Sequence, residues 1–126
     1  MLKFLIALVV TGLLLWGGLP YAHGQKATEM FIPLGQSPGL SGKYSVIGKI
    51  EKIDARSRTI AGQSWSAQVT DRTQIWLDRS ELRLTNQTGT FTDLRKGQRV
   101  EVKYESEGKG PAEWIKVQIT RPSARQ

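Results

Sequence analysis

The sequence predicts an all-β domain of about five to six short strands, folded as a small OB-like Greek-key barrel with a short helical insert. Short segments of alternating apolar and polar residues follow one another between turn signals over residues 44–120. Gly48 interrupts the first of them, and Ile53 falls out of phase with Ile50, which indicates a bulge or sharp bend. A closed barrel would also leave fewer strand edges exposed than an open sandwich. A generic small β-roll is the alternative.

Along the chain, each expected strand is a short run in which apolar and polar residues alternate, and a turn follows it. Turn residues such as Asp54, Asp71 and Gly97 separate them. Asp78 and Glu81 have the spacing of an N-cap and the third helical residue, so residues 79–85 are expected to form one or two helical turns or an irregular excursion. The expected strands are 44–53, 59–61, 65–69, 73–77, 98–104 and 112–120.

The chain begins with the pattern of a secretory signal. Lys3 precedes an apolar run over residues 4–19, and Ala22 and Gly24 form a small-x-small cleavage site. We therefore expect an exported protein, periplasmic or secreted; anchoring in an inner membrane through residues 4–19 is the alternative. The expected organisation is a signal peptide at 1–24, an irregular arm at 25–43, the barrel at 44–120 and a basic tail at 121–126.

Composition excludes several kinds of chemistry. The chain has no cysteine, so disulfides, Cys-ligated zinc, iron–sulfur clusters and thiol catalysis are excluded. Its one histidine, His23, would leave with the signal peptide, and with it any Ser-His-Asp triad or imidazole metal site. The aspartates stand at turns, where short carboxylates accept backbone N–H groups. We expect no metal, no cofactor and no catalytic residue.

Three patterns carry a resemblance to a known family. They are Gly48-x-Ile50-x-x-Ile53-Asp54, Asp93-Leu94-x-x-Gly97-x-x-Val100-x-Val102 and Ala112-x-x-Ile115-x-Val117. In this order they resemble exported bacterial proteins with small OB-like β-barrels, a family of unknown function. The resemblance covers residues 44–120 and implies the fold and export, but no site residues.

Two tryptophans are candidates for a binding platform. OB barrels stack bases or sugars on exposed aromatic residues beside basic ones. Trp65 and Trp76 are expected on neighbouring strands, and three arginines are expected near them. The alternative is that both rings belong to the core. The arginines are Arg56, Arg58 and Arg72.

Trp114 is a third aromatic candidate. It is out of phase with Ile115 and Val117, so it is expected on the outer face of its strand. Phe31 lies in a short apolar stretch of the arm, residues 30–34, that is expected to lie against the domain or a partner. Trp114 and Phe31 would then either cover each other or together meet a partner.

These observations favour an exported, non-catalytic binding or interaction module of the cell envelope. The net charge of +7 suits an anionic envelope component, and another envelope protein is the second kind of partner. One alternative is an OB-type nucleic-acid-binding domain, which the export signal opposes. A carboxylate-dependent envelope enzyme is the other. Contact with a membrane is expected only through an uncleaved signal segment.

Overall fold

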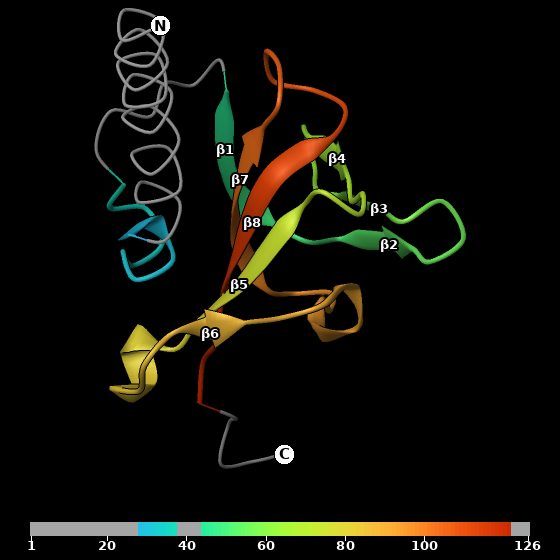
Figure 1. Ribbon diagram of the computed structural model, residues 1–126. Helices are drawn as coiled ribbons and strands as arrows, with labels where there is room; N and C mark the ends of the chain where they lie inside the picture. The colour runs from blue at the N-terminus through green and yellow to red at the C-terminus, as the bar shows by residue number, and fades with distance from the viewer. Residues whose placement is uncertain (1–27, 38–43, 122–126) are drawn as a thin grey trace, which may run out of the picture.

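A computed structural model describes residues 28–37 and 44–121 (Figure 1). The described chain is all-β and forms two sheets, which confirms the predicted class. The eight strands exceed the expected number because several are very short. They are β1 (Ser45–Lys49), β2 (Lys52–Asp54), β3 (Thr59–Ala61), β4 (Ser66–Gln68), β5 (Gln74–Asp78), β6 (Gln87–Thr88), β7 (Arg99–Tyr104) and β8 (Ala112–Gln118).

The larger sheet has five strands in the order β1-β7-β8-β5-β6. Its neighbours are antiparallel except β5 and β8, which run parallel and pair Trp76 with Lys116. The edge strand β6 was not expected. It pairs Gln87 and Thr88 with the end of β5, so part of the insert folds back onto the sheet.

The smaller sheet, β2-β3-β4, is connected to the larger one through a bend after β1. Ile50 N–H donates to Gln98 O beside β7 at 2.9 Å, and Glu51 N–H donates to Ala61 O on β3 at 2.8 Å. The chain thus changes sheets at these two residues, where the sequence predicts a bend.

The expectation of a closed barrel is wrong for the described residues. β4 is three residues long, and it meets the start of β8 only through a single parallel bridge between Gln68 and Pro111. The chain then turns at Thr70, whose N–H donates to the Thr73 hydroxyl at 2.9 Å, before β5 begins. This turn interrupts the ladder that would close the barrel.

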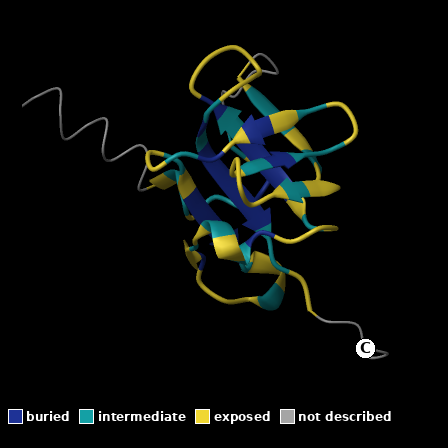
Figure 2. Cartoon of the chain, turned by 90° about the vertical axis from the view of Figure 1, so that its right-hand side faces the viewer, coloured by how far each residue is buried: buried dark blue, intermediate teal, exposed yellow. Residues whose placement is uncertain are grey.

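The core lies between the two sheets. Alternate residues of each strand point inward, and the apolar alternation of β7 and β8 therefore places Val100, Val102, Ile115 and Val117 at zero exposure. Figure 2 shows the buried residues concentrated in the strands, with the exposed ones mainly in the loops. The remaining core residues are Ile50, Ile60, Ala67, Val69, Ile75, Leu77, Leu94, Tyr104 and Ala112.

The expected insert at residues 79–85 contains a single turn of 3₁₀ helix, η1 (Ser80–Leu82), within the one or two turns expected. A second single turn, η2 (Phe91–Asp93), follows β6 outside that insert. Asp78 accepts the Ser80 N–H at 3.0 Å, which ends β5 and starts η1. At the second turn Asp93 accepts the Thr90 N–H at 2.8 Å, completing a capping box.

Of the expected arm, residues 28–37 are described, and we call them the N-terminal segment. They form successive turns, with Phe31 N–H and Ile32 N–H each donating to the carbonyl three residues earlier. The expected signal peptide and the tail beyond Arg121 lie outside the described residues. In the part of the chain that is described, no helix is long and apolar enough to cross a membrane.

Candidate functional site

The outer face of the five-stranded sheet carries an unusual set of buried charges. Asp78 on β5, Glu101 on β7 and Lys116 on β8 are exposed by 1%, 3% and 0%. They alternate with core residues such as Val117, so they point away from the core. Buried charges are costly unless they are paired and hydrogen-bonded, so their partners decide what this face does.

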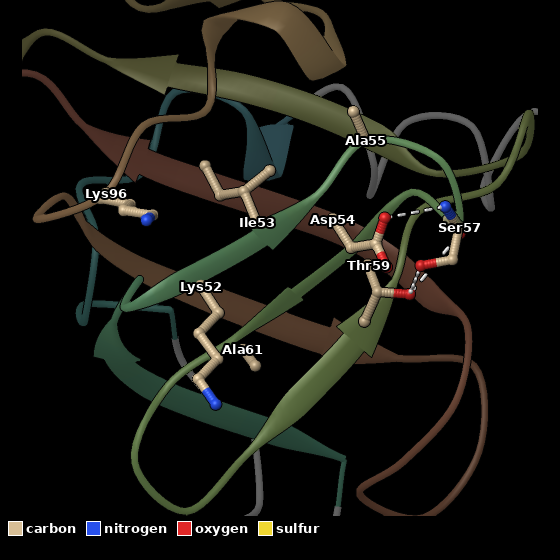
Figure 3. A pocket seen from close by; sticks show the side chains of 8 residues that line it. All are labelled: Lys52, Ile53, Asp54, Ala55, Ser57, Thr59, Ala61 and Lys96. Atoms are coloured by element: carbon tan, nitrogen blue, oxygen red, sulfur yellow. Dashed lines mark hydrogen bonds between the residues drawn. The ribbon is translucent and has the colours of Figure 1, made fainter.

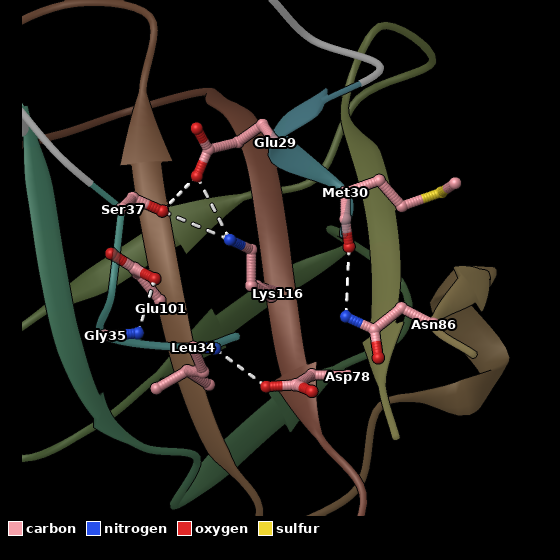
Figure 4. A network of polar contacts seen from close by, with 9 residues as sticks. All are labelled: Glu29, Met30, Leu34, Gly35, Ser37, Asp78, Asn86, Glu101 and Lys116. Atoms are coloured by element: carbon pink, nitrogen blue, oxygen red, sulfur yellow. Dashed lines mark hydrogen bonds and ion pairs between the residues drawn. The ribbon is translucent and has the colours of Figure 1, made fainter. Parts of the chain in front are cut away.

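Both carboxylates of this face bind the backbone of the N-terminal segment (Figure 4). Leu34 N–H donates to Asp78 Oδ2 at 2.7 Å, and Gly35 N–H donates to Glu101 Oε1 at 2.9 Å. Gly35 has a φ of +84°, a conformation that favours glycine. The sheet thus recognises consecutive main-chain groups of a segment with a defined backbone shape.

Lys116 is the cation at the centre of this face. Its Nζ lies 3.1 Å from Glu29 Oε1 and 3.2 Å from Ser37 Oγ, at the two ends of the N-terminal segment. The Ser37 hydroxyl also donates to the Glu29 carboxylate, which closes a small network (Figure 4). On the sheet side the ammonium lies 4.9 Å from the centre of the Trp114 ring, a cation–π distance.

A fourth buried polar residue, Asn86, holds the beginning of the segment. Its Nδ2 donates to Met30 O at 3.0 Å, and its Oδ1 accepts the Arg79 N–H at 2.8 Å. The side chain therefore connects the segment to the loop between β5 and β6. In the described part of the chain, no buried side-chain nitrogen or oxygen is without a hydrogen-bond partner.

The environment of Asp78 keeps it charged. Burial raises the pKa of this carboxyl, but hydrogen bonds from Ser80 and from Leu34 N–H, together with the Lys116 charge, outweigh burial and hold the pKa below its usual range. The carboxylate is therefore an acceptor for the segment over the ordinary pH range.

Two predicted binding residues lie on this face. Trp76 and Trp114 are 4% and 2% exposed, and their ring centres are 5.4 Å apart. Trp114 is on the outer side of β8, as the alternation predicts, and it is buried there beside Lys116 rather than exposed. Phe31, expected to pack with it or beside it, lies in the segment with 55% exposure.

Trp65 is separated from this pair. It precedes β4 in the smaller sheet, so the expectation that Trp65 and Trp76 lie on neighbouring strands is wrong. Its ring packs on the backbone of Gly48 and Gly62: a Cβ at these glycines would come within 2.3 and 2.0 Å of Trp65 Nε1. The glycines provide the space in which the ring is half-buried.

The three predicted arginines are exposed and dispersed. Arg58 lies over the Phe91 ring at 5.3 Å and 4.0 Å from Asp71, whereas Arg72 pairs with Glu105 at 3.1 Å. Arg56 is at the tip of the β2–β3 hairpin. That any of these arginines, or the tryptophans, bind a ligand stays a prediction.

A hollow of about 560 Å³ opens on the outer side of the β2–β3 hairpin (Figure 3). Lys52 and Lys96 line it, and neither forms an ion pair with a described residue. Hydrogen bonds from Ser57 and from Arg56 N–H lower the pKa of Asp54, the one carboxylate in the wall. The remaining lining residues are Ile53, Ala55, Ser57, Thr59 and Ala61.

No group of three or more acidic, histidine or cysteine side chains that could hold a metal ion occurs among residues 28–37 and 44–121. Comparison with protein-family models, curated proteins and solved structures finds no match for this chain. The resemblance to exported OB-like domains therefore stays a prediction.

The polar sheet face is not among the features expected from the sequence. Asp78 is expected at a turn, where it does accept the Ser80 N–H, but Glu101 and Lys116 are not among the expected site residues. The available signal was the alternation of β8, which puts Lys116 on the same side as Trp114. What covers that side depends on a segment about eighty residues away, which no local pattern reveals.

Proposed function

We propose that the protein is an exported, non-catalytic binding module of the cell envelope, with an OB-like arrangement of its two sheets, and that its ligand is an anionic envelope component. The observation that carries the proposal is the hollow beside the β2–β3 hairpin. Lys52 and Lys96 project their ammonium groups around it without a carboxylate partner among the described residues (Figure 3).

Electrostatics favours an anion at this place. Two cations that have no ion-pair partner among the described residues attract negative charge to the hollow, and the ligand displaces water without first breaking an ion pair with those residues. The one carboxylate in the wall, Asp54, is already engaged by backbone N–H groups of Arg56 and Ser57 at 3.0 and 3.3 Å. Phosphate and carboxylate groups of lipids or polysaccharides have the required charge.

The β2–β3 connection adds two further cations near the same end of the smaller sheet. Arg56 stands between two residues that line the hollow, and Arg58 follows them in the turn. A polymer or lipid surface with repeated negative charges would meet several cations at once, whereas a single small anion would meet few. We therefore expect binding that falls steeply with salt.

The proposal is tested by binding of the exported form to three probes: phosphatidylglycerol-containing vesicles, alginate as an anionic polysaccharide, and single-stranded DNA. Lys52→Glu and Lys96→Glu should each weaken binding to the preferred envelope probe at least about fivefold, since one lysine near an anionic surface contributes about 1 kcal/mol and the new carboxylate adds repulsion. Lys109→Glu makes the same charge change outside the hollow and is the control.

Three results would each contradict the proposal. Equal losses for Lys109→Glu and the hollow variants would mean that net charge, not the hollow, determines binding. Binding to neither vesicles nor alginate would remove the anionic envelope ligand. Tighter binding to DNA than to both would favour the nucleic-acid-binding alternative.

A further inference from the structure

The sheet face under the N-terminal segment has the properties of a peptide-binding site that its own chain occupies. The polar contacts between the segment and the sheet join residues far apart in sequence, such as Leu34 to Asp78, Gly35 to Glu101 and Glu29 to Lys116. None of them is a contact that chain connectivity imposes. The same contacts would form with an identical segment from another molecule.

The chemistry of this face suits reversible occupation. An apolar face must stay covered, whereas Asp78, Glu101 and Lys116 would be hydrated when the segment leaves. The segment is held by polar contacts that water can replace and by burial of the Leu34 side chain, on a face that also carries the buried rings of Trp76 and Trp114.

The site is selective for this segment. It takes a carboxylate at Glu29, two successive N–H groups at Leu34 and Gly35, and a hydroxyl at Ser37. The Leu34 side chain is buried, and the positive φ of Gly35 disfavours other residues there. A second copy of this chain is the partner certain to present the whole pattern.

Exposed apolar residues surround the docked segment. Phe31 is in the segment, Ile47 lies beside Gly35, and Leu84 is in the loop whose Asn86 holds the segment. Their exposures are 55%, 44% and 51%. These residues are exposed near the docked segment, so a contact between two copies at this place would bury apolar surface, which is favourable.

We propose that two copies of the chain exchange their N-terminal segments, each segment docking on the sheet face of the other copy. The result is a two-fold symmetric dimer. Residues 38–43 connect the segment to the domain, and exchange of an element through a short connection is a low-cost route to dimers. The dimer uses the sheet face, and the hollow beside the β2–β3 hairpin remains free.

Charge reversal tests the exchange in the full-length chain. Glu29→Lys and Lys116→Glu each put like charges together within one copy. When the two variants are mixed, only reciprocal exchange restores an ion pair at both sites. We expect the equimolar mixture to double its mass in light scattering, while each variant alone does not.

The double variant Glu29→Lys/Lys116→Glu is the control, because it restores the pair within one chain. It should have the mass of the unsubstituted chain at the same concentration. The proposal is overturned if the double variant is as stable as the unsubstituted chain while the mixture stays at the mass of its components. That result would show that the segment docks only within its own chain.

A second measurement does not depend on the folding of Lys116→Glu. A synthetic peptide of residues 28–37 is added to the full-length Glu29→Lys chain, whose own segment is weakened, and tryptophan fluorescence is followed. We expect saturable binding, weakened at least tenfold when the peptide itself carries Glu29→Lys. Absence of binding, or equal binding of both peptides, would contradict exchange.

Discussion

The backbone N–H of Leu34 donates to the buried carboxylate of Asp78 at 2.7 Å, across 44 residues of sequence. This bond joins a segment outside the sheets to the end of a central strand. Together with the Gly35–Glu101 bond and the Glu29–Lys116 ion pair, it makes the N-terminal segment part of the folded unit. The domain therefore begins at least sixteen residues before β1.

Removal of the Glu29 carboxylate should cost more stability than removal of the Lys116 charge. In Glu29→Gln the fully buried Lys116 ammonium keeps only Ser37 and Trp114 as neighbours. In Lys116→Met the remaining Glu29 carboxylate can turn into water. We expect a loss of about 3 kcal/mol in unfolding free energy for Glu29→Gln and clearly less for Lys116→Met, measured by urea denaturation.

The pair Lys103–Glu113 is the matched control for that experiment. Its N–O distance is also 3.1 Å, but the side chains are 26% and 29% exposed. Lys103→Met and Glu113→Gln should each cost under about 1 kcal/mol. Equal costs for the two pairs, or equal costs for the two variants of the buried pair, would contradict the account.

Docking of the segment should weaken in acid. The folded-state pKa of Asp78 lies below its ordinary value near 3.8, so its contribution to stability is fully present above that value and is lost as the pH falls through the folded pKa. In NMR titrations the Leu34 amide signal should shift upfield only at pH values below this ordinary pKa, as its acceptor is protonated. Asp78→Asn should remove this acid transition.

Asp54→Asn is the control for the acid transition. Asp54 also has a lowered pKa, from hydrogen bonds of Ser57 and of Arg56 N–H, but it stands in the β2–β3 hairpin. The variant should leave the acid shift of Leu34 N–H in place. Loss of the shift in Asp54→Asn as well would indicate a global transition rather than titration of Asp78.

The tryptophan pair on the sheet face gives an optical test. Rings with centres 5.4 Å apart couple their transitions, so Trp76 and Trp114 should produce an exciton couplet in the far-ultraviolet circular dichroism. Trp76→Phe or Trp114→Phe should each abolish the couplet, and Trp65→Phe should not. Trp114→Ala should also cost about 3–5 kcal/mol of stability.

The Trp65 ring should limit substitution at the glycines that it covers. A Cβ at Gly62 would clash with the ring at 2.0 Å and with Lys49 O at 2.7 Å, whereas the three atoms nearest to a Cβ at Gly48 all belong to the ring. Gly48→Ala should cost about 1–3 kcal/mol and Gly62→Ala more. Adding Trp65→Leu should restore the stability lost in Gly48→Ala but not the stability lost in Gly62→Ala. Equal recovery in both would mean that the ring alone, and not Lys49 O, excludes a side chain at Gly62.

The sequence predicts the strands whose burial follows a regular alternation of apolar and polar residues along the strand itself. The apolar alternation of Val100, Val102 and Tyr104 identifies β7, and that of Ile115 and Val117 identifies β8, because one face of each lies on the core. The bend after β1 was also predictable. Closure of the barrel was not predictable, because it depends on whether β4 pairs along β8. In the structure, β4 and the start of β8 share a single bridge.

The polar face could not be predicted for a related reason. Lys116 and Glu101 have the alternation of solvated strand residues, and only the position of Glu29 and Gly35 decides that they are buried. Likewise β6 depends on the loop returning to Trp76 and Leu77. Prediction from local pattern fails where a residue's environment is supplied by a distant segment.

Hydrogen exchange at the Leu34 amide tests most directly whether the N-terminal segment belongs to the fold. Its N–H donates to a carboxylate that is 1% exposed. Measured by NMR near pH 6, it should exchange far more slowly than the Ser37 amide, for which no hydrogen bond to a described residue occurs, and the protection should be lost in Asp78→Asn. Exchange of Leu34 at the rate of an unstructured chain would contradict the account.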